Sequence, residues 1–104
     1  MYSIGMALKL KPGQYAEYKR RHDELWPEME RMMHAQDVSM VIYRHGEWLF
    51  IHGTAPTEEH FGRTGTDPIT PKWNEYMKDV LQVDETGDLI VHELPLAFSF
   101  GDFA

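Results

Sequence analysis

Residues 17–30 read EYKRRHDELWPEME, a helical pattern that a proline interrupts shortly after a histidine. Apolar and aromatic side chains recur around this stretch at steps of three and four, which predicts a helix with one inward face. These positions are Tyr15, Tyr18, His22, Leu25, Met29 and Met33. Pro27 has no amide hydrogen for the carbonyl of Asp23 and disfavours helical angles at Trp26. We therefore expect one helix to end between His22 and Trp26, and a second to begin with Pro27.

His22 is the first candidate for chemistry, because the pattern puts it at the end of a helix, one turn from Tyr18 and on the same face. The free carbonyls and the helix dipole at that end favour the imidazolium, whereas burial opposes it. The alternative is that His22 is a hydrogen-bonded structural residue, as histidines on inward faces often are. The neighbouring basic cluster, residues 19–21, is expected to be a solvated face with local ion pairs, with the alternative that Arg20 or Arg21 orients a neighbouring carboxylate.

The order Tyr18-x-x-x-His22-x-x-x-Trp26-Pro27-Glu28, within this run, resembles the signature of the L-rhamnose mutarotases. The resemblance covers nearly the whole chain, from a short first strand through a hairpin and a second helical region to a late strand. It implies an isomerase that interconverts the α and β anomers of a small neutral sugar, L-rhamnose, with no cofactor.

The resemblance also implies roles for single residues. It makes His22 the proton donor, Tyr18 a contact to sugar hydroxyls and Trp73 a stacking platform, although core packing explains Trp73 equally well. Two positions depart from the family's pattern. Asn74 stands where relatives often have a second tryptophan, and Met40 where they often have a tyrosine. Asn74 can still bind a hydroxyl but Met40 cannot replace a phenol, which leaves the preferred sugar open.

The rest of the chain supplies the remaining elements of one fold. Alternation predicts a first strand over residues 3–11, and Gly46 supplies the positive φ for a hairpin of residues 38–44 and 47–54. A short helix is expected over 57–63, a better one over 70–81 capped by Thr70, and an extended segment over 89–100. This order predicts an α+β fold of the split βαβ, ferredoxin-like type, an antiparallel sheet with helices on one face.

Both arms of the hairpin are apolar on both faces, in contrast to a strand with one wet side. The few helices of so short a chain cover only one side of the sheet. We therefore expect the other side to pack against a second copy, giving a homodimer of the dimeric α/β-barrel type that the resemblance also implies. A C-terminal segment folded over the sheet is the alternative cover.

Length and composition limit the number of domains, the cellular compartment and the possible partners. A length of 104 residues fits a single domain, 1–104. The lack of cysteine excludes disulfides and thiolate chemistry and suits the reducing cytoplasm, where we expect the protein to work. The net charge of −7 argues against a nucleic-acid partner. No run approaches the ~20 apolar residues of a membrane span, and the first ten residues show no signal-peptide pattern.

The five histidines besides His22 have no paired spacing on one helix, so we predict no metal site.

Two functions other than the mutarotase stay open from the sequence. A small haem-binding monooxygenase of the same dimeric architecture would instead use a histidine as an iron ligand. A carbohydrate-binding module without chemistry would bind the sugar only. For the mutarotase we expect anomer exchange to peak near neutral pH and to fall on the alkaline side.

Overall fold

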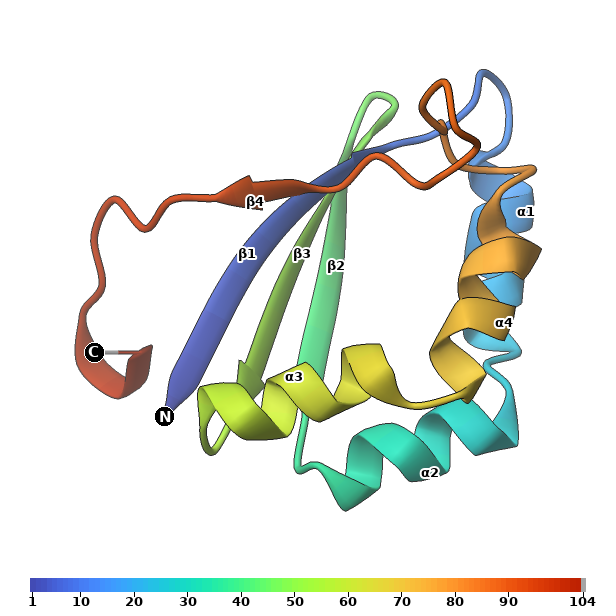
Figure 1. The fold of residues 1–104 in the computed structure, drawn as a ribbon. Coiled ribbons are helices and arrows are strands. Elements are labelled where there is room, and N and C mark those ends of the chain that lie inside the picture. Colours follow the sequence, from blue (N-terminus) through green and yellow to red (C-terminus); the bar gives the residue numbers. More distant parts are fainter. Residues whose placement is uncertain (104) are drawn as a thin grey trace.

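The computed structural model of the protein describes residues 1–103 (Figure 1). Its elements, in chain order, are β1 (Tyr2–Lys9), α1 (Tyr15–Asp23), α2 (Pro27–Ala35), β2 (Ser39–His45), β3 (Trp48–Ala55), α3 (Glu58–Thr66), α4 (Ile69–Met77), β4 (His92–Leu94) and the 3-10 helix η1 (Gly101–Phe103). Within these residues each α-helix has nine residues, too few to cross a bilayer, for which ~20 are needed.

The strands form one antiparallel sheet in the order β2-β3-β1-β4. The four α-helices lie on one side of it, as Figure 1 shows, so the predicted ferredoxin-like arrangement is confirmed. The β2–β3 turn has Gly46 at φ 61°, the left-handed conformation that glycine adopts without strain. The chain after β4 extends away from the body of the fold at the opposite side of the sheet.

The predicted break in the first helical region is confirmed. α1 ends at Asp23, and Trp26 has the extended angles φ −59° and ψ 133° before Pro27 opens α2 as its first residue. The cause is the one expected from the sequence, because proline restricts its predecessor and fits the first helical turn. The break lets α1 and α2 run in different directions (Figure 1).

Several predicted boundaries were wrong by a few residues. The helix α4 spans Ile69–Met77 in place of 70–81, because the Asp67 carboxylate accepts the Ile69 amide hydrogen at 3.0 Å, whereas the Thr70 hydroxyl donates to the carbonyl of Thr64 and caps nothing. β1 ends at Lys9 and α3 continues to Thr66.

The last extended segment is broken at Pro95, as the sequence predicts, because proline cannot donate to a ladder. Its strand β4 has three residues and pairs with β1 only up to Leu94.

The core lies between the sheet and the helices. Leu8 and Leu49 contribute from the sheet, Tyr18 from α1, and Trp73 and Met77 from α4. Val80 and Leu81 are buried as expected, although α4 has already ended and a turn carries them inward. This packing fixes α1 and α4 against the same side of the sheet, next to the hollow described below.

Candidate functional site

A cavity of about 440 Å³ opens between the sheet and the helices. It is lined by all five residues singled out from the sequence: Tyr18 and His22 on α1, Met40 on β2, and Trp73 and Asn74 on α4. These residues belong to three segments that are far apart in the sequence. The fold brings them to one hollow because α1 and α4 lie on one side of the sheet that contains β2.

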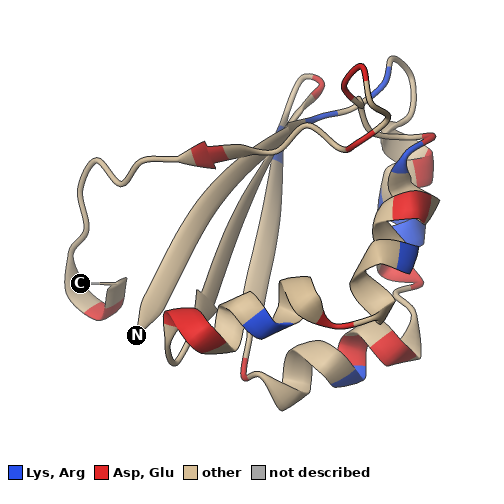
Figure 2. Ribbon diagram, viewed as in Figure 1, with Lys and Arg blue, Asp and Glu red and all other residues tan. Residues whose placement is uncertain are grey.

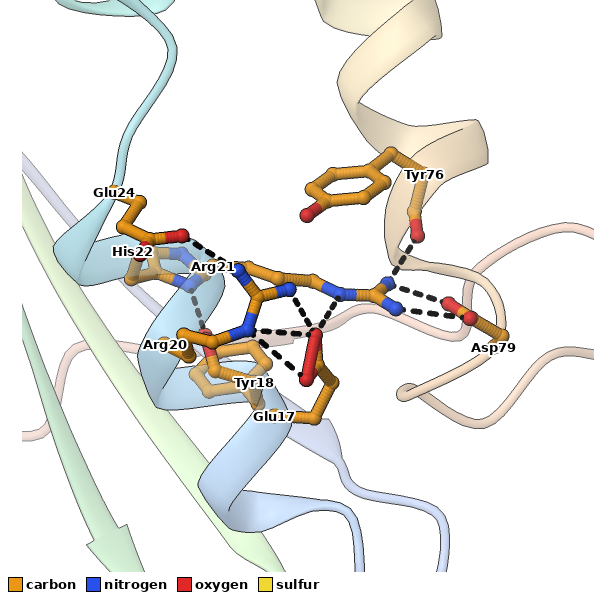
Figure 3. Close-up of polar contacts among 8 residues, drawn as sticks. All are labelled: Glu17, Tyr18, Arg20, Arg21, His22, Glu24, Tyr76 and Asp79. Carbon is orange, nitrogen blue, oxygen red and sulfur yellow. Dashed lines mark hydrogen bonds and ion pairs between the residues drawn. The ribbon is translucent and has the colours of Figure 1, made fainter.

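His22 lies in the last turn of α1, where its Nδ1 is 3.2 Å from the carbonyl oxygen of Tyr18 (Figure 3). A carbonyl oxygen only accepts hydrogen bonds, so Nδ1 carries the hydrogen. In the neutral ring the lone pair is therefore on Nε2. The backbone carbonyl thus selects the tautomer in which Nε2 can act as a base.

Within residues 1–103, three polar atoms at the site have no hydrogen-bond partner: Nε2 of His22, the hydroxyl oxygen of Tyr18 and Nε1 of Trp73. Tyr18 is only 5% exposed and Trp73 is also buried. No buried side-chain nitrogen or oxygen of these residues lacks a partner, so the three atoms must reach open space. All three side chains line the cavity, and Tyr18 and His22 also line a smaller hollow of about 180 Å³. The three polar atoms are free to bind a ligand with hydroxyl groups.

Burial controls the titration of the two residues on α1. It lowers the pKa of His22, and this effect outweighs the opposing influence of the Tyr18 carbonyl and the Asp23 carboxylate. Burial also raises the pKa of the Tyr18 phenol. The expectation that the helix end favours the imidazolium is thus overridden by desolvation. Near neutral pH the site holds a neutral imidazole beside a protonated phenol.

Aromatic rings hold His22 in place. Its ring centre is 4.4 Å from that of Tyr18 and 5.3 Å from that of Trp73, which it meets edge to face. Trp26, at the helix break, packs at 5.1 Å against Trp73 and stacks at 5.0 Å on Tyr76. Trp73 thus packs in this cluster and also lines the cavity, and its stacking on a sugar stays a prediction.

Arg21 is the residue that the sequence analysis missed. It was expected on a solvated face, but it is 8% exposed and its guanidinium reaches Asp79, the carbonyl of Tyr76 and the carboxylate of Glu17 (Figure 3). The same group lies 4.3 Å from the centre of the Tyr76 ring. The only signal in the sequence was its place directly before His22. Lys19 and Arg20 do form the expected local ion pairs on the exposed side.

Charged side chains lie outside the lining of the cavity. Figure 2 shows Lys, Arg, Asp and Glu mainly on the helices and loops, with a few on the strands, such as on β4, and none of these residue types lines the hollow. Within residues 1–103 no three His, Asp or Glu side chains are grouped closely enough to hold a metal ion. The arrangement can bind a neutral polar ligand and move a proton at His22.

Comparison with known proteins assigns the chain to a family. Residues 3–97 match the family model described as L-rhamnose mutarotase. The chain belongs to the L-rhamnose mutarotase family. The L-rhamnose mutarotase of Rhizobium johnstonii is 33% identical over 94 residues, which cover 88% of this chain and 89% of that protein.

Solved structures agree with this assignment. The crystal structure of an L-rhamnose mutarotase from Formosa agariphila is similar to this chain with a TM-score of 0.82 and 26% identity, over 97% of this chain and 100% of that one. A dimeric ferredoxin-like protein from an uncultured marine organism matches with a TM-score of 0.64 and 11% identity over 95% and 98% of the two chains, a likeness of fold alone. Membership of the mutarotase family favours the isomerase over the haem monooxygenase that shares the architecture.

Proposed function

We propose that the protein catalyses the interconversion of the α and β anomers of L-rhamnose, as an isomerase acting on a free sugar. The observation that carries the proposal is that His22 and Tyr18 line one cavity in a chain of the mutarotase family, with Nδ1 of His22 held by a backbone carbonyl so that Nε2 is left as the base. Anomer exchange needs one group that takes a proton and returns it, and a positioned histidine is suited to both steps.

The chemistry starts from the neutral imidazole. Nε2 of His22 takes the proton from the anomeric hydroxyl while water at the open side of the cavity protonates the ring oxygen, and the bond between C1 and the ring oxygen breaks. The free aldehyde turns about its bond to C2. The ring oxygen then attacks the other face of C1 and loses its proton to water, and the imidazolium returns its proton to the new anomeric oxygen. His22 is thus the proton donor of the closing step.

The substrate is held by the other groups at the site. The Tyr18 phenol remains protonated because burial raises its pKa, so its hydroxyl donates to a sugar oxygen. Trp73 offers Nε1 and a ring edge, and Asn74 an amide at the exposed rim of the cavity. Met40, 43% exposed, contributes only apolar contact.

Selective-inversion NMR on L-rhamnose tests the proposal. Exchange between the two anomer signals should be faster with the protein than without it, at equal pH and buffer. A carbohydrate-binding module would change the signals of the bound sugar and leave exchange at the spontaneous rate, which would contradict the proposal.

The protein further acts, in this proposal, as a homodimer joined through the open face of the sheet. The strand register aligns Tyr43, Phe50, Ala7 and His92 in one row of that face. The next row contains Val41 and Leu94, and both of these side chains are exposed, as are Tyr43 and Phe50. An apolar face of this kind is typical of an interface with another chain.

The segment of residues 95–103 supports a second copy as the partner. Leu96, Phe98 and Phe100 continue the alternation of Leu94 and are 74 to 83% exposed. Between this segment and the open face lies a hollow of about 1020 Å³, lined by Tyr43 and His52 as well as by these aromatic side chains. In a two-fold dimer the face and segment of each copy cover those of the other. We assign this dimer to the cytoplasm, in keeping with a chain that has no cysteine.

A further inference from the structure

The wall of the cavity is rich in methionine. All six methionines that follow Met1 line the cavity: Met6, Met29, Met32, Met33, Met40 and Met77. They come from β1, α2, β2 and α4, so the methionine lining surrounds the hollow and does not belong to one helix. Methionine is a flexible apolar side chain that adapts to ligands of irregular shape.

Few polar groups remain to bind hydroxyls. Two threonines line the cavity, but the Thr64 hydroxyl donates to the carbonyl of Phe61 and the Thr70 hydroxyl to the carbonyl of Thr64. Besides these threonines, the polar groups of the lining are those of Tyr18, His22, Trp73 and Asn74. L-Rhamnose presents a ring oxygen and four hydroxyls to these four polar side chains, and the rest of the wall, the two threonines aside, offers apolar side chains only.

The cavity is also larger than a bare deoxyhexose. Its 440 Å³ corresponds to about fifteen water molecules at ~30 Å³ each, whereas L-rhamnose has eleven non-hydrogen atoms. The excess space is bordered by half-buried or exposed apolar side chains such as Met33, Met40 and Ile42. An apolar group on the sugar would fill this space and contact the apolar wall.

We infer that the site prefers a 6-deoxyhexose with one hydroxyl converted to a methyl ether, and with its anomeric hydroxyl free, over L-rhamnose itself. The inference rests on the proposed function, since the same anomer exchange is carried out. The free hemiacetal is required because His22 takes its proton from the anomeric oxygen. One added methyl in an apolar pocket favours the better-fitting substrate by about 10-fold or more.

Saturation-transfer NMR on L-rhamnose and on its 2-, 3- and 4-O-methyl ethers tests the inference. At least one ether should show kcat/KM about 10-fold above that of L-rhamnose. Equal or lower values for all three ethers would overturn the inference and leave the proposed function intact. Acceleration of none of the four sugars would instead contradict the proposed function and the inference with it.

Variants at Met40 locate the preference. Met40→Tyr adds a hydroxyl to the lining and should move the ether-to-rhamnose ratio toward one, whereas Met40→Leu keeps the wall apolar and should retain it. Val91→Tyr places the same phenol on an exposed residue outside the cavity and should leave the ratio as it is. Should Met40→Tyr fail to fold, as judged by circular dichroism, Met40→Gln repeats the test. An unchanged ratio in the folded Tyr or Gln variant would overturn the role of this wall.

Discussion

The guanidinium of Arg21 and the carboxylate of Asp79 form a two-point ion pair, with nitrogen–oxygen distances of 2.5 and 2.9 Å (Figure 3). The pair joins α1 to the turn that follows α4. Arg21 directly precedes His22 in α1, and it also contacts Tyr76 of α4, whose ring packs against Trp73. The geometry of the site therefore depends on how these contacts hold the two helices together. Arg21 lowers the pKa of the Asp79 carboxyl, as an opposite charge at this distance should.

Asp79→Asn should reduce the free energy of unfolding by about 1 kcal/mol, a modest loss because the carboxylate is largely exposed and the amide keeps one hydrogen bond. Arg21→Ala should cost more, about 2 kcal/mol, since it also leaves the carbonyl of Tyr76 without a donor. Urea denaturation measures both. Glu75→Gln removes a pair on the exposed side of α4 and serves as the control, with an unchanged midpoint expected. Equal effects of all three variants would contradict the account.

His22 should also shape the dependence of stability on pH. Its pKa is lowered in the folded protein, so between that value and the unfolded value of about 6.5 the unfolded chain binds a proton that the folded protein does not. Stability should therefore fall as the pH drops below about 6.5, and level off below the folded pKa. In His22→Gln this slope should be absent. Urea midpoints between pH 5 and 8 measure it, and parallel curves for the two proteins would count against burial of a neutral imidazole.

Tyr18→Phe should act on binding more than on chemistry. Removing one hydrogen bond to the sugar should raise KM for L-rhamnose about 10-fold and change kcat by less than about 3-fold. The ring still packs against His22, so the fold should persist. Exchange rates across a range of sugar concentrations separate the two constants. A fall in kcat equal to that in kcat/KM would instead assign Tyr18 to the transition state.

The proposed dimer depends on residues 95–103 in its interface. Light scattering of the full chain should give twice the 12.2 kDa mass of one chain. Phe98→Asp combined with Phe100→Asp places two charges in the proposed interface and should produce monomers at micromolar concentration. Glu85→Gln, on an exposed turn outside this segment, is the control. A full-length protein that is already monomeric would refute the dimer.

Several features of the fold could be predicted because they depend on local chemistry. Pro27 determines the break between α1 and α2 through its missing amide hydrogen, and Gly46 determines the hairpin turn through its positive φ. Alternation in the first strand assigned Met6 and Leu8 to the helix side of the sheet, and both line the cavity there. These signals lie within a few residues of the elements that they predict.

Other features depend on contacts between distant residues. Arg21 has the same local pattern as Arg20, and only the position of Asp79, 58 residues later, makes one buried and the other exposed. The start of α4 was misplaced because Asp67 competes with Thr70 as a cap, and the sequence does not show that Thr64 engages the Thr70 hydroxyl. The direction of the His22 pKa shift likewise required the extent of burial, which the helix end alone does not give.

The central claim is that neutral His22 carries the proton between the anomeric oxygens, and saturation-transfer NMR of L-rhamnose with His22→Asn tests it most directly. The parent protein should show kcat/KM that is level above neutral pH and falls on the acid side as Nε2 becomes protonated, at a pH below the ordinary histidine pKa of about 6.5 because burial lowers the pKa of His22. This acid-side fall replaces the alkaline-side fall expected from the sequence. The His22→Asn protein should fold, bind the sugar and exchange its anomers 10² to 10⁴ times more slowly, which is about the contribution of a positioned acid or base. Exchange as fast as with the parent protein would contradict the account.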